Sequence, residues 1–214
     1  MSNTGNTLLV DRAKQDLFAS LVYLNAMVNL FGKDTAYAME HLAIANDRLI
    51  TNECDYHEFM YYARTLIRAF FAQVDGVCYV LRRLVLWAHD RAEIQLSDEE
   101  LYLLSEGDRG TSGSRMRKYN SVADNLVFSC AHFSKLFGDE YLLNKSTNEW
   151  AVFRRAIAAR HAITHPKDVE SFVLPARTLE DIRHSIIWFS ETMKELLKIC
   201  GRYLEEKRRE RDGA

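Results

Sequence analysis

Hydrophobic residues recur three and four positions apart along most of the chain, which is the spacing of one face of an α-helix. The period is kept longest between about residues 55 and 91, which predicts one long amphipathic helix there. Its apolar positions are Phe59, Ala63, Leu66, Phe70, Val74, Val77, Leu81, Leu84 and Ala88. Gly76 weakens such a helix by about 1 kcal/mol relative to Ala, so we expect a packing partner to approach closely there.

Two shorter helices are predicted before it. A first one, from about residue 11 to 31, is indicated by Leu17, Leu21, Leu24, Val28 and Phe31. Gly32 is a natural stop for this helix, because glycine is the preferred residue just past a helix end. Asp34 can cap a second helix that runs to about residue 49.

The second half of the chain shows clear start and stop signals. Ser97 and Glu100 form a capping-box pattern that begins a short helix ending near Gly107. Residues 108–118 are predicted to be a loop. Three more helices are expected at about 121–137, 146–165 and 178–203, and Pro166 should end the second of them. The charged tail after Tyr203 reads as a solvated helix end.

Helix-breaking residues are scarce, with two prolines and nine glycines in 214 residues, and sequence patterns typical of β-strands are nearly absent. This composition favours long helices and argues against a turn-rich β-sandwich. We therefore predict an all-α fold, an antiparallel helical bundle in a single domain over residues 1–214. Residues 1–10 and 205–214 are expected to be flexible ends.

Charge and cysteine content exclude several classes of protein. The formal net charge of −2 argues against a grip on nucleic acid by the whole surface, although a local basic patch is compatible with it. The four cysteines form no CxxC pair, so neither a zinc knuckle nor a disulfide framework is indicated. The apolar run at the N-terminus is too short for a signal peptide, and no stretch is long enough to span a bilayer. A cytoplasmic protein is the expectation.

Candidate chemistry gathers where the helix before Pro166 ends. Arg160 and His165 are five residues apart, so a straight helix would splay them by roughly 140°. The break at Pro166 could let His165 swing back beside Arg160. An arginine can hold a phosphate and a histidine can move a proton near neutral pH, so together they suit attack of an RNA 2′-hydroxyl on its own phosphate. Cationic side chains are also favoured at a helix C-terminus without any function.

The segment Arg-His-Ala-Ile-Thr-His-Pro at 160–166 resembles the motif of the HEPN superfamily of small helical domains. That motif is an Arg, four to six residues and then a His near the end of a bundle helix, and a polar residue commonly follows the Arg. The resemblance covers this helix and the final one, and over the first 140 residues it rests on all-helical character. It implies a HEPN-like bundle with extra N-terminal helices.

The resemblance also implies an activity. Active HEPN proteins are endoribonucleases that need no metal or other cofactor and act in toxin–antitoxin modules, phage defence and RNA processing. Arg160 would bind the scissile phosphate, His165 would transfer a proton, and His161 would hold the geometry or contact RNA. Two copies of the motif would meet across a homodimer, and an antitoxin or defence-complex subunit is a further possible partner.

Further residues and other interpretations stay open. Weaker substrate contacts are expected from Thr164, Lys167, Arg155, Arg115 and Arg117. Arg155, followed by five residues and His161, is a second pairing with acceptable spacing. His161 and His165 also have the spacing of a helical metal pair, but no third ligand is fixed by the sequence, so we expect no metal. The main alternative is a catalytically inactive helical interaction or scaffold subunit.

Overall fold

The predicted long helix is the central element of the fold. The computed structural model describes residues 4–105, 121–168 and 173–212, with side chains from residue 21 on, and within these ranges it contains six helices and no strand. They are α1 (Thr4–Ile50), α2 (Tyr56–Asp90), α3 (Asp98–Leu104), α4 (Val122–Lys135), α5 (Asn148–Thr164) and α6 (Ala176–Asp212). The all-α prediction is confirmed.

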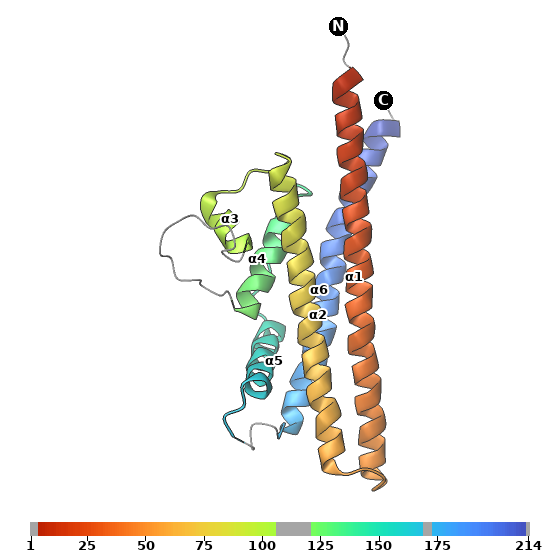
Figure 1. Cartoon of the computed structure of the whole chain (residues 1–214), viewed down its shortest axis with the longest axis vertical. Helices are drawn as coiled ribbons and strands as arrows, with labels where there is room; N and C mark the ends of the chain where they lie inside the picture. Colours follow the sequence, from red (N-terminus) through yellow and green to blue (C-terminus); the bar gives the residue numbers. More distant parts are fainter. Residues whose placement is uncertain (1–3, 106–120, 169–172, 213–214) are drawn as a thin grey trace.

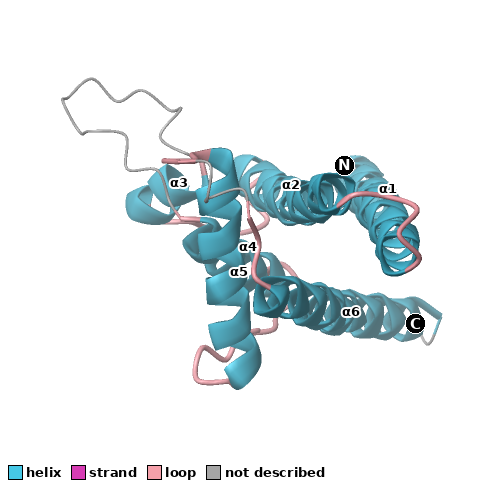
Figure 2. Ribbon diagram, turned by 90° about the horizontal axis from the view of Figure 1, so that it is seen from below, coloured by secondary structure: helices cyan, strands magenta, loops and turns pink. Residues whose placement is uncertain are grey.

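The helices are arranged around α2. α1 runs antiparallel to α2 and packs along it, while α4, α5 and α6 pack on other sides of α2 (Figures 1 and 2). α5 and α6 also pack on each other, and both chain ends lie at the same end of the elongated molecule (Figure 1). α1 therefore stands at one edge of the bundle, with α5 at the opposite edge.

The N-terminal half differs from the prediction of two helices, because α1 continues through Gly32. The side of α1 that faces α2 keeps its three- and four-residue spacing across this position, with Leu24, Thr35 and Ala38 buried. The Thr35 hydroxyl donates to Oε1 of Gln73 on α2 at 2.8 Å. Continuous packing on α2 outweighs the cost of about 1 kcal/mol that a glycine imposes on a helix interior. One long helix therefore replaces the two expected ones.

Other boundaries differ by smaller amounts. α6 begins at Ala176 and continues to Asp212, so residues 205–212, like residues 4–10, are helical where flexible ends were expected. α5 ends at Thr164, just before Pro166, as predicted. The predicted loop at 108–118 lies outside the described residues.

Gly76 has the close neighbour that its position predicts. A Cβ atom built on Gly76 would lie 2.5 Å from Cε2 of Phe31 on α1. The ring of Phe31 thus lies against the bare backbone of α2, and any larger residue would displace this ring or the helix that carries it. This contact sets the spacing of α1 and α2 midway along both.

Aromatic side chains join α2, α5 and α6 into one core. The ring of Phe70 lies 6.4 Å from that of Phe153 on α5 and 6.0 Å from that of Phe189 on α6, both edge-on. Phe71 also packs on Phe153, with ring centroids 6.0 Å apart. All four rings are buried. Such pairs contribute about 0.5–1.5 kcal/mol each beyond their area burial.

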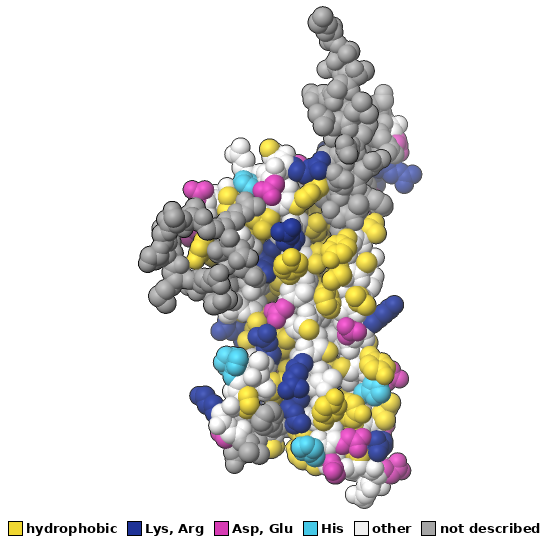
Figure 3. Space-filling model, viewed as in Figure 1, with side chains coloured by type: hydrophobic (Ala, Val, Ile, Leu, Met, Phe, Trp, Pro, Cys, Tyr) yellow, Lys and Arg dark blue, Asp and Glu magenta, His cyan; other side chains and the backbone are white. Residues whose placement is uncertain are grey.

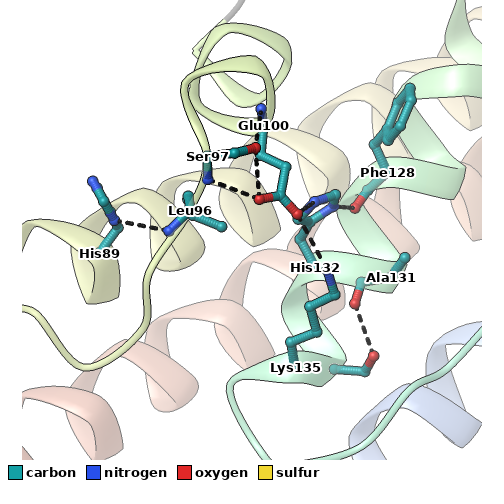
Figure 4. A network of polar contacts seen from close by, with 9 residues as sticks. His89, Leu96, Ser97, Glu100, Phe128, Ala131, His132 and Lys135 are labelled. Atoms are coloured by element: carbon teal, nitrogen blue, oxygen red, sulfur yellow. Dashed lines mark hydrogen bonds and ion pairs between the residues drawn. The ribbon is translucent and has the colours of Figure 1, made fainter.

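A polar network attaches α3 to α4 (Figure 4). Glu100 accepts from the Ser97 backbone N–H at 2.9 Å, which completes the predicted capping box. Its other oxygen, Oε1, lies 3.1 Å from Nε2 of buried His132 and 3.2 Å from Nζ of Lys135. The Ser97 N–H above all, together with hydrogen bonds from the Ser97 hydroxyl, Lys135 and His132, lowers the pKa of Glu100 to about 2. His132 faces an acceptor at each ring nitrogen, since Nδ1 lies 2.9 Å from the Phe128 carbonyl.

We expect Gly76→Ala to destabilise the protein by about 1 kcal/mol, because overpacking against Phe31 costs more than the helix gains from alanine. Gly201 in α6 is the matched control, since an added Cβ there meets nothing within 4 Å. Gly201→Ala should stabilise by up to about 1 kcal/mol. Urea unfolding of both variants measures the difference, and equal stabilisation by the two would show that Phe31 does not fill this site.

We expect Glu100→Gln to lower the free energy of unfolding at pH 7 by about 1–2 kcal/mol, because charge-assisted bonds to Ser97, Lys135 and His132 weaken. Since folding lowers the pKa of Glu100, its contribution is full above the unfolded value of about 4.3 and disappears as pH falls through about 2. Denaturant unfolding between pH 7 and 2 should show the two proteins converging. Glu99→Gln, an exposed neighbour, is the control and should change little.

Candidate functional site

The end of α5 is built as the sequence predicts. Pro166 pushes the preceding residue out of the helical region, and His165 has φ −127° and ψ 64°. The His165 N–H still donates to the His161 carbonyl at 3.0 Å. Thr164 donates its hydroxyl to the Arg160 carbonyl at 2.7 Å, so its side chain serves the helix end. The segment thus holds both imidazoles on one short, fixed turn.

Arg160 points from α5 toward α2. Its Nη2 donates to Oδ2 of Asp75 at 3.0 Å, and its guanidinium carbon lies 5.9 Å from the ring centroid of Phe71. Both side chains of the ion pair are partly exposed, Arg160 to 33% and Asp75 to 41%. Asp75 is a member of the site that sequence reasoning missed, because it lies 85 residues earlier in the chain.

The two histidines lie together on the outer side of the same helix end. Their ring centroids are 5.0 Å apart with the planes tilted by 58°, and both residues are exposed. Among the described residues, no polar contact joins Arg160 to His165, so the expected swing of His165 toward Arg160 is not seen. The structure instead gives an imidazole pair, with the guanidinium of Arg160 directed to the neighbouring helix.

Arg155 is held by a different partner. Its Nε and Nη2 donate to the two carboxylate oxygens of Asp181 on α6, both at 2.8 Å. This fork lowers the pKa of Asp181 and raises that of Arg155. The geometry ties α5 to α6 and favours Arg160, which donates to its carboxylate through one nitrogen, over Arg155 as the phosphate ligand.

The structure says less about the remaining residues that were predicted to contact the substrate. Lys167 is exposed just beyond the helix end, and Arg115 and Arg117 lie outside the described residues. Within the described ranges, no group of three or more His, Cys, Asp or Glu side chains is placed to hold a metal ion. A groove of about 350 Å³ lies between α1, α2 and the start of α6, away from the motif.

A basic and aromatic strip follows the exposed side of α2. Tyr61, Arg68, Tyr79 and Arg83 are exposed on this side, and Asp75 borders it toward α5. Figure 3 shows a line of Lys and Arg side chains over this part of the molecule, next to hydrophobic side chains over α1. The spacing of these residues was a usable signal in the sequence, hidden by the stronger apolar pattern of the buried side.

Comparison with known proteins gives no assignment: no family model, no curated protein and no solved structure matches this chain. Among the helices that the structure describes, none combines the length and apolar character needed to cross a membrane.

We expect Asp181→Asn to lower stability at neutral pH, because Arg155 then loses a charged partner. Since folding lowers the pKa of Asp181, its contribution is full above the unfolded value of about 3.9 and is lost as pH falls below it. Urea unfolding at pH 7 and pH 3 should show a difference that shrinks in acid. Glu180→Gln, an exposed change in the same helical turn, is the control. A pH-independent difference would contradict this explanation.

Proposed function

We propose that this chain is a metal-independent endoribonuclease of the HEPN type that works as a homodimer, in a toxin–antitoxin or phage-defence setting in the cytoplasm. The observation that carries the proposal is the end of α5, where two exposed imidazoles 5.0 Å apart stand on the helix that also presents Arg160. These are the groups that phosphodiester transfer needs.

The reaction follows from these groups. The RNA 2′-hydroxyl attacks the adjacent phosphorus, a base takes the hydroxyl proton, and an acid protonates the departing 5′-oxygen. The products are a 2′,3′-cyclic phosphate and a 5′-hydroxyl. His165 acts in these proton transfers, and His161 orients the His165 ring or contacts the RNA. Arg160 binds the phosphate and stabilises its added charge.

For Arg160 to bind the phosphate, Asp75 must release it. A partly exposed ion pair of this kind contributes only about 0–1 kcal/mol, so exchange of the carboxylate for a phosphate is inexpensive. A phosphate offers Arg160 two parallel hydrogen bonds where Asp75 takes one. In the free protein, Asp75 therefore keeps Arg160 extended toward α2 until RNA arrives.

We expect the wild type to cleave labelled single-stranded and hairpin RNAs in excess EDTA and to leave 2′,3′-cyclic phosphate ends. His165→Ala should slow cleavage by about 10²–10⁴-fold, and Arg160→Ala by about 10²–10³-fold. The controls are His57→Ala, an exposed histidine on α2, and Arg154→Ala, an exposed arginine on α5. Wild-type rates in His165→Ala, or no cleavage by wild type, would contradict the mechanism.

A second candidate function is a catalytically inactive helical interaction subunit. It is favoured by the Arg160–Asp75 contact, in which the arginine proposed to bind phosphate is already paired with a carboxylate. It is also favoured by exposed apolar side chains on α1. The same assay separates the two: an interaction subunit leaves every RNA intact, including at protein concentrations where it self-associates.

A further inference from the structure

α1 carries a second apolar stripe, on a side that α2 does not cover. Tyr23, Leu30, Tyr37 and Ile44 follow one another at intervals of seven residues and are 56%, 54%, 65% and 47% exposed. We call these four residues the outer stripe. It runs from residue 23 to residue 44, or about 32 Å of helix. Large apolar residues in one exposed line mark an interaction surface. Seven residues separate equivalent positions in successive heptads of paired helices, so the stripe supplies one apolar position per heptad.

The outer stripe faces the same way as the exposed side of α2. The ring of Tyr37 lies 4.3 Å from that of His41, which stacks at 5.6 Å on Tyr62 of α2. Tyr62 in turn meets Tyr61 at 5.3 Å, and Tyr61 is exposed. This row of rings crosses from α1 to α2, so the stripe and the basic strip of α2 share one face, the one seen in Figure 3.

We propose that a second copy of this chain covers the outer stripe, with its α1 antiparallel to the first and the two-fold axis at Tyr37. In this register Tyr37 meets Tyr37 of the second copy, and Leu30 meets Ile44. Residues three and four positions from the stripe lie on its two sides and flank the contact. Lys33 then lies beside Glu40 of the second copy, on one side of the stripe.

The other side of the stripe is complementary as well. It places Asp34 beside His41 of the second copy, which can donate a hydrogen bond or carry positive charge. Each of these pairs occurs twice because of the two-fold axis. The same surface is thus self-complementary in shape and in charge, as an isologous interface requires.

The exposed tyrosines of α2 favour the antiparallel over the parallel orientation. Thr35 lies level with Gln73, and Phe31 lies level with Gly76, so Tyr37 stands level with residues 70 and 71 of α2. An antiparallel copy lays α2 over α2 about this level and brings Tyr61 against Tyr79 of the second copy. Both tyrosines are 55% exposed in one chain. A parallel copy would leave them uncovered, because its α2 would lie on the opposite side of the paired α1 helices.

This orientation bears on the candidate site, a consequence that rests on the proposed function. It places the α5 helices of both copies on the same side of the dimer, with the Arg160–Asp75 pairs bordering one shared strip of arginine residues. The pairing itself depends only on α1 and α2.

Oligomeric state tests the surface. Sedimentation of the full chain at tens of micromolar should give twice the 24.8 kDa chain mass, and Leu30→Glu or Tyr37→Glu should give the monomer mass with an unchanged helical spectrum. Ile187→Glu, an equally exposed isoleucine on α6, is the control and should leave the dimer intact. A monomeric wild type, or a dimeric Leu30→Glu, overturns the proposal.

Cross-linking tests the register. In a Cys54→Ser background, a mixture of Leu30→Cys and Ile44→Cys chains should form a disulfide, because position 30 faces position 44 of the second copy within the distance that a disulfide spans and neither position faces itself. Each variant alone should cross-link far more slowly. Rapid cross-linking of Leu30→Cys with itself would mean a parallel pair and would overturn the antiparallel register.

The two proposals fail separately. An antiparallel dimer that leaves RNA intact contradicts the ribonuclease function and supports the pairing. Cleavage by a protein that sediments as a monomer supports the activity and contradicts the pairing. Leu30 lies on α1 and the motif on α5, so loss of cleavage together with the dimer in Leu30→Glu would show that the site needs both copies.

Discussion

The packing of Phe153 on Phe71 determines where the candidate site lies. Phe153 and Arg160 are seven residues apart on α5, so they share one side of that helix. Phe71 and Asp75 are four apart on α2 and share a side in the same way. Once the two rings meet in the core, with centroids 6.0 Å apart, Arg160, two turns further along α5, reaches Asp75, one turn further along α2. The ion pair is therefore an outcome of core packing.

Sequence periodicity predicted most of the helices because each apolar side is a local pattern read over a few turns. It failed at Gly32, where a local stop signal competed with packing that only the partner helix reveals. It also missed Asp75 and Asp181, since each meets its arginine across helices from a distant part of the chain. The candidate residues on α5 were found because Arg160, His161 and His165 lie within six positions. Their partners depend on helix packing, which periodicity does not specify.

The two arginines of α5 illustrate how similar residues acquire different roles. Both oxygens of the nearly buried Asp181 carboxylate bind Arg155. Loss of Arg155 would therefore leave the charge of Asp181 uncompensated. Arg160 makes one hydrogen bond to a partly exposed carboxylate and lies against an aromatic ring. The first arrangement, the Arg155–Asp181 contact, suits a residue that fixes α5 to α6. The second suits a ligand that changes partners, because water already screens much of what it would lose.

α1 is an edge helix with two apolar sides, an inner one on α2 and the outer stripe. Its inner side alone would stabilise a hairpin with α2, and the outer stripe would then only add exposed apolar surface. Soluble proteins rarely expose such apolar surfaces, because these promote association with any apolar partner. On α1 the charged residues Lys33, Asp34 and Glu40 interrupt the apolar face between stripe positions. Among antiparallel registers, they penalise those that bring like charges together and allow the one in which opposite charges meet. In the dimer proposed above, the charges that flank the outer stripe are therefore matched by the same surface turned about a two-fold axis.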